Sequence, residues 1–213
     1  MAENNDDYYE LTVDLNEALI ENGFIDEYFY MKDLNQRKLF INDLIDQSYI
    51  IDVIRHIMQY NREDSGIPES ERKPILLYLT TNGGSVDAGF ELIDVIQSSK
   101  TPVYTINLGW WYSMGSLIGM AGHKRFAMTN SKILMHDGSN FVYNSGAKAQ
   151  DQMEFQKRVE DRVREYVLKN STVSPEEYDE KLRVEWYLFA DEAKEKGFID
   201  YIVGVDCEID EIV

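Results

Sequence analysis

A serine and a histidine in the stretch 107–136 are the side chains of this protein best suited to nucleophilic catalysis. Ser113 follows an apolar run, 103–108, and three aromatic residues, and it precedes a small apolar segment typical of a helix. His136 follows the short apolar run 133–135. A serine hydroxyl attacks a carbonyl when a nearby base such as histidine accepts its proton. A serine at a helix start also commonly caps the helix, and a histidine at a strand end is commonly structural, so both interpretations stay open.

Gly83 and Gly84 form a second candidate feature, because this pair also follows an apolar run, 75–79, and precedes a helical pattern, 86–98. Glycine has no Cβ, so its backbone N–H can approach a substrate closely. The N–H groups of Gly84 and Met114 could both point at a developing oxyanion, and each such donor contributes roughly 10²–10³ in rate. The simpler interpretation is that the glycines only form a turn.

Strand and helix patterns alternate around these candidates. The expected strands are 38–41, 75–79, 103–108, 125–128, 132–135 and 198–203, and the expected helices are 47–60, 86–98, 113–122, 147–170, a short one from Ser174, and 190–196. This alternation predicts βαβ units and a mainly parallel sheet with flanking helices. Because the carboxyl ends of parallel strands lie at one edge of a sheet, we expect the turn at Gly83 and the serine at position 113 to meet there.

Length, charge and cysteine content narrow the class of protein. The 213 residues suffice for one domain with a hydrophobic core. A formal net charge of −18 argues against nucleic acid and anionic membranes as partners, because both are polyanions. Cys207 is the single cysteine, which precludes an internal disulfide and favours a reducing compartment. The chain starts without a secretory signal pattern, and no apolar run approaches the ~20 residues of a membrane span, so we expect a cytoplasmic protein.

The segment 1–36 differs from the rest of the chain. It carries ten Asp or Glu residues against one Lys, and aromatic residues interrupt the acids. We interpret it as an acidic N-terminal arm that docks within the molecule or on a neighbour. A partly mobile terminus is the alternative. Residues 37–213 are expected to form one domain.

Three runs of the chain, taken together, resemble the proteolytic subunit of the Clp protease. They are TTNGGSVDAG at 80–89, SMGSLIGMAGHKRFAMTNSKILMH at 113–136 and FADEAKEKGFID at 189–200. The similarity covers roughly residues 37–204. It implies an α/β serine peptidase domain with the ClpP/crotonase-like fold, in which a handle helix protrudes at about 137–172.

The resemblance also implies roles for single residues. Ser113 would be the nucleophile and His136 the base, and the N–H groups of Gly84 and Met114 would form the oxyanion hole. Glu185 stands where the family has an aspartate as the acid of the triad. Glutamate can orient a histidine as aspartate does, provided that its extra methylene has room.

Two further departures from the family bear on assembly and substrate access. The family often carries an arginine directly before the acid, used across the ring interface, whereas this chain has Val184 there and Arg183 one place earlier. Residues 110–112, Trp-Trp-Tyr, replace small residues before the serine. Either one of these rings narrows the substrate groove, or strand alternation sends the middle ring into the core and the other two to the opposite face.

The resemblance places substrate-binding positions at Gly83, Ser85, Phe141 and Gly146. A strand after His136 would pair with an extended peptide, which suits a sequence-tolerant peptidase because main-chain bonds carry the affinity. The family further implies a ring-shaped homo-oligomer, possibly two stacked heptamers, with an AAA+ unfoldase ATPase as partner and unfolded proteins or peptides as substrates. No metal or organic cofactor is implied.

Three other functions remain compatible with the residues. One is a non-catalytic or regulatory subunit of the same fold, which the changes at Glu185 and at 110–112 favour and the presence of both serine and histidine disfavours. Another is an acyl-CoA enzyme of the related crotonase fold, which would not need the serine–histidine pair. The last is a peptidase that uses a lysine base, with Lys124 or Lys132 as candidates.

Overall fold

The computed structural model describes residues 21–138, 145–181 and 183–213. The chain divides into a smaller unit that ends at Leu39 and a larger unit, Phe40–Val213. In the smaller unit, α2 (Ile25–Asn35) is a helix without buried residues. The sequence predicted an acidic arm over 1–36 without assigning it secondary structure, and residues 1–20 of that arm lie outside the described part of the chain.

Seven strands form one sheet: β1 (Lys38–Ile41), β2 (Ile75–Thr81), β3 (Val103–Tyr112), β4 (Lys124–Met128), β5 (Lys132–Met135), β6 (Trp186–Phe189) and β7 (Tyr201–Val203). The order is β1-β2-β3-β4-β7, and β5 pairs with both β3 and β6. The pairings of β3 with its three neighbours and of β4 with β7 are parallel, whereas β5 and β6 are antiparallel. The sheet confirms the predicted mainly parallel α/β architecture.

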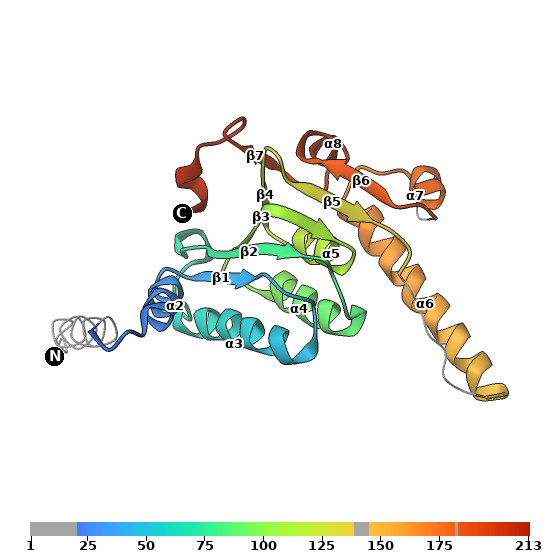
Figure 1. The fold of residues 1–213 in the computed structure, drawn as a ribbon, viewed down its shortest axis with the longest axis horizontal. Coiled ribbons are helices and arrows are strands. Elements are labelled where there is room, and N and C mark those ends of the chain that lie inside the picture. Colours follow the sequence, from blue (N-terminus) through green and yellow to red (C-terminus); the bar gives the residue numbers. More distant parts are fainter. Residues whose placement is uncertain (1–20, 139–144, 182) are drawn as a thin grey trace. The chain divides into compact units, whose positions relative to one another are not determined.

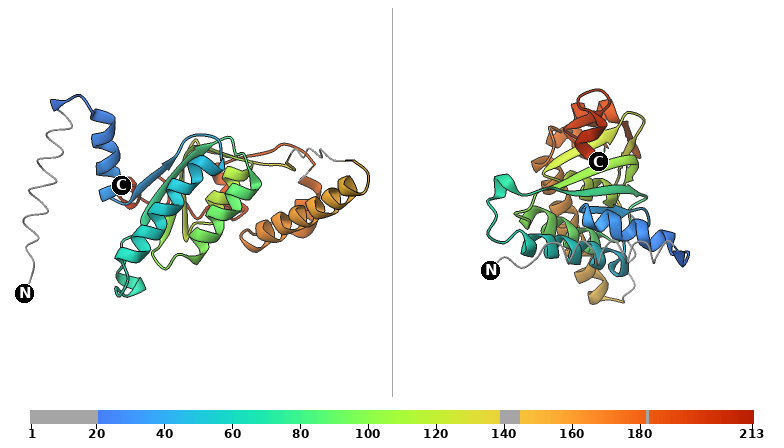
Figure 2. Two further views of the ribbon diagram at one scale, coloured as in Figure 1. Left: turned by 90° about the horizontal axis from the view of Figure 1, so that it is seen from below. Right: turned by 90° about the vertical axis from the view of Figure 1, so that its left-hand side faces the viewer.

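The helices of the larger unit are α3 (Gln47–Glu63), α4 (Val86–Ser98), α5 (Met114–Met120), α6 (Ala147–Lys169), α7 (Pro175–Lys181) and α8 (Ala190–Glu195), with 3₁₀ turns η1 (Glu69–Glu71) and η2 (Ile209–Ile212). Figure 2 shows α3 and α4 packed side by side along the sheet. The side chain of Asp46 caps the start of α3, and an apolar stripe with helical spacing faces inward: Ile50, Val53, Ile54, Ile57. No helix in the described part of the chain is long and apolar enough to cross a membrane.

Strand β3 changes partner along its length. Residues 104–107 pair with β4, and residues 110–112 pair with β5. Asn107 lies buried at the change, where its Nδ2 donates to the carbonyl of Lys132 (3.0 Å) and its Oδ1 accepts from the N–H of Gly109 (3.1 Å). The sequence predicted that this strand ends at residue 108. The strand instead continues to residue 112, because residues 110–112 pair with β5, and Ser113 follows directly.

Near the C-terminus, one predicted strand is shorter in the structure and one strand was not predicted. The strand expected at 198–203 begins only at Tyr201, although Phe198 and Ile199 are buried. Strand β6 was not predicted at all. Its pairing partner lies about fifty residues earlier in the chain, so no local pattern announces it.

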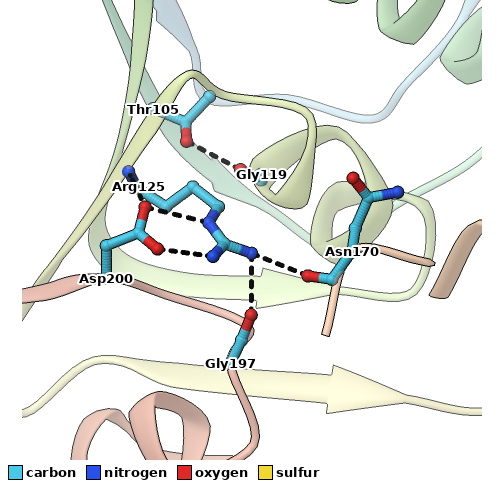
Figure 3. Close-up of polar contacts among 6 residues, drawn as sticks. All are labelled: Thr105, Gly119, Arg125, Asn170, Gly197 and Asp200. Carbon is cyan, nitrogen blue, oxygen red and sulfur yellow. Dashed lines mark hydrogen bonds and ion pairs between the residues drawn. The ribbon is translucent and has the colours of Figure 1, made fainter. Parts of the chain in front are cut away.

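Arg125 on β4 ties the C-terminal end of α6 to the sheet. Its guanidinium makes a forked contact with the carboxylate of Asp200, and its Nη1 donates to the carbonyls of Asn170 (2.8 Å) and Gly197 (2.7 Å) (Figure 3). Charge-assisted bonds of this kind are stronger and more directional than neutral ones. Elsewhere along α6, the one buried residue is Val167, and Figure 1 shows the helix extending away from the sheet as a handle.

Candidate active site

Ser113 occupies the junction between β3 and α5 in a backbone conformation that residues other than glycine rarely adopt. Its φ is 54° and its ψ is −123°. Such a conformation costs on the order of 1–3 kcal/mol and persists only where the surroundings impose it. Here the N–H of Ser113 donates to the carbonyl of Leu134 on β5 (2.9 Å). The serine side chain makes no capping hydrogen bond to α5, so helix capping does not account for a serine at this position.

Ser116, one turn into α5, holds this junction together and was missed by the sequence analysis. Its buried Oγ lies 2.7 Å from the carbonyl of Trp111 and 2.9 Å from that of Leu134. The hydroxyl therefore links the end of β3 and the end of β5 to the first turn of the helix. A hydroxyl within an otherwise apolar helix was the available signal, because a buried polar group requires partners.

The Gly83–Gly84 turn meets the serine, as the strand topology predicted. A Cβ placed on Gly83 (φ 91°) would lie 2.7 Å from the carbonyl oxygen of Tyr112 and 2.8 Å from the Cβ of Ser113. On Gly84 (φ 149°), a Cβ would lie 2.3 Å from the carbonyl oxygen of Ile45. Glycine is therefore required here by close backbone approach as well as by positive φ.

The backbone N–H groups of Gly84 and Met114 are the two candidate oxyanion donors. The N–H of Ile45 donates to Gly83 and the N–H of Ser85 donates to Ile45 (2.9 and 2.7 Å), so the peptide groups flanking Gly84 face Ile45. Because the Gly83–Gly84 peptide is trans, the N–H of Gly84 points opposite to the carbonyl of Gly83 and therefore away from Ile45. Met114 is the first residue of α5, so its N–H has no acceptor within the helix. This nitrogen would lie 3.0 Å from a Cβ on Gly83, on the same side of the turn as the serine.

His136 and Glu185 contact each other at the ends of β5 and β6. The antiparallel register pairs Met135 with Trp186, so the next pair outward is His136 opposite Glu185. The Nδ1 of the histidine lies 3.1 Å from Oε1 of the glutamate. The side chains are 24% and 57% exposed, respectively. A carboxylate at Nδ1 favours the tautomer with the proton on Nδ1, which leaves Nε2 as the basic nitrogen.

Ser113 and His136 line one small cavity of about 70 Å³. The remaining walls come from α4, α5, β5, α6, α7 and β6 and are mainly apolar: Val86, Met114, Leu117, Met135, Gly138, Val163 and Trp186. Tyr178 and Lys181 of α7 complete the lining. The sequence analysis singled out neither of them. Their inward placement depends on how α7 packs, which a seven-residue pattern does not reveal.

The predicted substrate-binding residues have other surroundings. Ser85 caps α4, where its Oγ accepts from the N–H of Ala88 (3.3 Å). Gly146 directly precedes α6 with a φ of 58°. Gly83, Ser85 and Gly146 are not among the residues that line the cavity. Phe141 lies outside the described residues.

The side chains of residues 110–112 alternate along the strand: the middle ring points into the core, and the other two lie on the opposite face. Trp111 is fully buried and packs on Gly119, where a Cβ would lie 2.3 Å from its indole. Trp110, on the opposite face, is 40% exposed and donates from Nε1 to Asn82 (3.0 Å). Tyr112 contacts the ring of Tyr187 at 5.9 Å. The cavity beside the serine is bounded by Trp186 instead of these three rings, so the narrowing hypothesis finds no support there.

Other candidate chemistries find little support in the described residues. Within these ranges, no group of three or more His, Cys, Asp or Glu side chains is arranged to hold a metal ion. The proposed alternative bases, Lys124 and Lys132, lie on β4 and β5, and neither lines the cavity. The ammonium of Lys124 lies over the ring of Tyr104, 5.1 Å from its centre.

Comparison with known protein families identifies the family of this chain. A family model described as "Clp protease" matches residues 23–206, which include every strand of the sheet and the whole of the candidate site. The match extends further toward the N-terminus than the resemblance noted from the sequence, and takes in α2. With this share of its length matched, the chain belongs to the Clp protease family.

Proposed function

We propose that this protein is a serine endopeptidase subunit that hydrolyses peptide bonds of unfolded proteins. The observation that carries the proposal is the strained Ser113, which shares a cavity with a histidine whose far nitrogen contacts a carboxylate. A serine whose backbone is held in a strained conformation, beside a base and two N–H donors, is the arrangement expected of a preorganised nucleophile. Neither a structural serine nor a helix cap would require it.

In this mechanism the Oγ of Ser113 attacks the peptide carbonyl while Nε2 of His136 accepts the hydroxyl proton. The N–H groups of Gly84 and Met114 stabilise the oxyanion. The tetrahedral intermediate then expels the amine, which takes the proton from the histidine, and an acyl-enzyme forms. Water, deprotonated by the same histidine, hydrolyses this ester. Glu185 keeps the ring oriented and stabilises its transient positive charge.

The same proposal includes a closed chamber. On α6, Met153 and Phe155 are 62% and 59% exposed, so this helix offers apolar surface that the monomer leaves uncovered. Burial of such surface favours association. We therefore expect rings, possibly stacked heptamers, and an AAA+ unfoldase that delivers unfolded chains. We also propose a cytoplasmic location, because a single cysteine favours a reducing compartment.

Labelling with a fluorophosphonate probe tests the proposal. We expect the wild-type protein to be labelled at one serine and to cleave unstructured peptides, and both signals to vanish in Ser113→Ala. Light scattering of both proteins should give the same oligomeric mass, since the substitution removes only one hydroxyl group. Absent labelling of a correctly assembled wild-type protein would instead favour the non-catalytic subunit.

A further inference from the structure

Apart from Ser113 and His136, the cavity beside the serine is lined by apolar residues and by two donors on α7. Tyr178 is only 3% exposed, and its hydroxyl forms no hydrogen bond with another described residue, but this oxygen is not among the fully buried polar atoms and so keeps contact with solvent. Burial raises the pKa of this phenol to about 12, so it stays a neutral O–H group at any physiological pH. Such a group in the wall of a candidate active site indicates that its partner comes with the substrate.

Lys181 supplies the second donor. It follows Tyr178 by three positions on the same helix, so both side chains project from one face of α7. The residue is half-buried and lines the same cavity. Its ammonium forms no ion pair or hydrogen bond within the described ranges, whereas most other partly buried charges of this region are paired.

Two ion pairs hold α7 in place, and neither of them involves Tyr178 or Lys181. Arg164 of α6 pairs with Asp179, and Lys196 pairs with Glu177, so α7 is tied on two sides. The carboxylates of Asp137, Asp179 and Glu160 and the guanidinium of Arg164 act on the phenol from a distance, with opposing effects.

We propose that Tyr178 and Lys181 are specificity-determining residues, which make this cavity select a substrate side chain that ends in a carboxylate or carboxamide. This inference rests on the proposed peptidase function. The acyl carbon bonded to Ser113 carries its own residue's side chain only two bonds away, so that side chain enters the cavity the serine lines. Apolar walls contact its methylenes, and the phenol and ammonium donate to its terminal oxygen. Glutamate and glutamine have this form.

The selection works mainly against the wrong side chain. A methionine or leucine in the cavity would offer no acceptor to either donor, and its apolar side chain would displace water that could otherwise bind them. Sites built to hydrogen-bond a substrate group reject an analogue lacking it far more strongly than apolar pockets reject a missing methylene. Methionine is close to glutamine in length and shape, so the comparison of these two isolates the polar contact.

The test uses quenched peptides that differ only at the residue before the cleaved bond, with Gln, Glu, Met or Leu at that position. We expect the wild-type kcat/KM to be about 10-fold or more higher for Gln and Glu than for Met. Tyr178→Phe removes only the hydroxyl and should lower the Gln-to-Met ratio by about 10-fold. Lys181→Met should lower the Glu-to-Gln ratio, because it removes the charge. Tyr187→Phe and Lys132→Met, on the outer face of β6 and β5, should leave both ratios as they are.

The outcomes separate this inference from the function beneath it. Cleavage that favours Met or Leu in the wild-type protein overturns the inference and leaves the peptidase standing. So does a Gln-to-Met ratio that Tyr178→Phe does not change. The wild-type ratio alone decides the matter if a variant fails to assemble. Absence of both cleavage and fluorophosphonate labelling in the assembled wild-type protein overturns the peptidase and the inference together.

Discussion

His136 and Glu185 face each other across the antiparallel pair β5–β6, with 3.1 Å between Nδ1 and Oε1. The extra methylene of a glutamate, relative to aspartate, is thus accommodated by the position of its strand. The carboxylate is 57% exposed, so solvent screens its interaction with the ring.

From this exposure we expect Glu185→Gln to lower kcat/KM by about 10-fold. His136→Ala removes the base itself and should cost roughly 10²–10⁴-fold. Steady-state kinetics with one peptide on both variants provides the comparison. Glu165→Gln, an exposed carboxylate on α6, serves as control. Equal losses for the two active-site variants would contradict the orienting role, and an unaltered rate in Glu185→Gln would leave Ser113 and His136 as a dyad.

The strained backbone at Ser113 predicts a trade between stability and activity. The free energy of unfolding of Ser113→Gly should exceed that of Ser113→Ala by about 1 kcal/mol, because glycine adopts φ 54°, ψ −123° without a Cβ penalty. Both variants should be inactive. Urea titrations followed by tryptophan fluorescence measure the difference. If alanine proves as stable as glycine here, the conformation carries no strain.

Gly84 should tolerate no side chain. In Gly84→Ala the new methyl would meet the backbone of Ile45 at 2.3 Å, so we expect a loss of about 1–3 kcal/mol beyond the cost of positive φ, together with slower fluorophosphonate labelling. Gly66→Ala is the matched control, since Gly66 also has positive φ (94°) but nothing lies within 4 Å of its added Cβ. Similar stability losses in both variants would show that the close approach at Gly84 contributes nothing.

The ion pair between Arg164 and Asp179 predicts a pH dependence of stability. The hydrogen bond from the guanidinium holds the pKa of the Asp179 carboxyl below its ordinary value of 3.8. Since the folded pKa is lowered, the carboxylate stabilises the fold above pH 3.8, and this contribution is lost as pH falls through the folded pKa. Asp179→Asn should therefore flatten the decline of unfolding free energy below about pH 4. Asp94→Asn, at an exposed position of α4, should keep the wild-type slope; a parallel slope for Asp179→Asn would refute the assignment.

Local sequence patterns predicted the elements whose ends are marked by capping residues or by proline. The helix expected at 86–98 has those bounds in the structure, because Ser85 caps it and Pro102 follows its end. Strand β5 likewise matches its predicted range. Strand β6 escaped notice because four residues, Trp186–Phe189, become a strand only through pairing with a distant segment. Propensity over so short a window carries little weight against tertiary context.

Some residues of the candidate site could also be predicted from the sequence, and others could not. Parallel-sheet topology was enough to predict that Gly83 would meet Ser113, because strand order places loop ends at one edge. The place of Glu185 came only from family resemblance, and the structure adds its contact with the histidine. Tyr178 and Lys181 could not be found from sequence, since their direction is set by the packing of α7 against α6.

The pairing of β5 with β6 has a consequence for the order of folding. His136 and Glu185 are separated by 49 positions, and closing a loop of that length costs about 3 kcal/mol of chain entropy before any contact repays it. Ser113, by contrast, lies where β3, α5, β4 and β5 follow each other with short connections. Contacts between near neighbours in sequence form early and distant ones late. We therefore expect the segment around Ser113 to form first and the contact between His136 and Glu185 to form last, so that the proposed triad would be complete only when β6 docks.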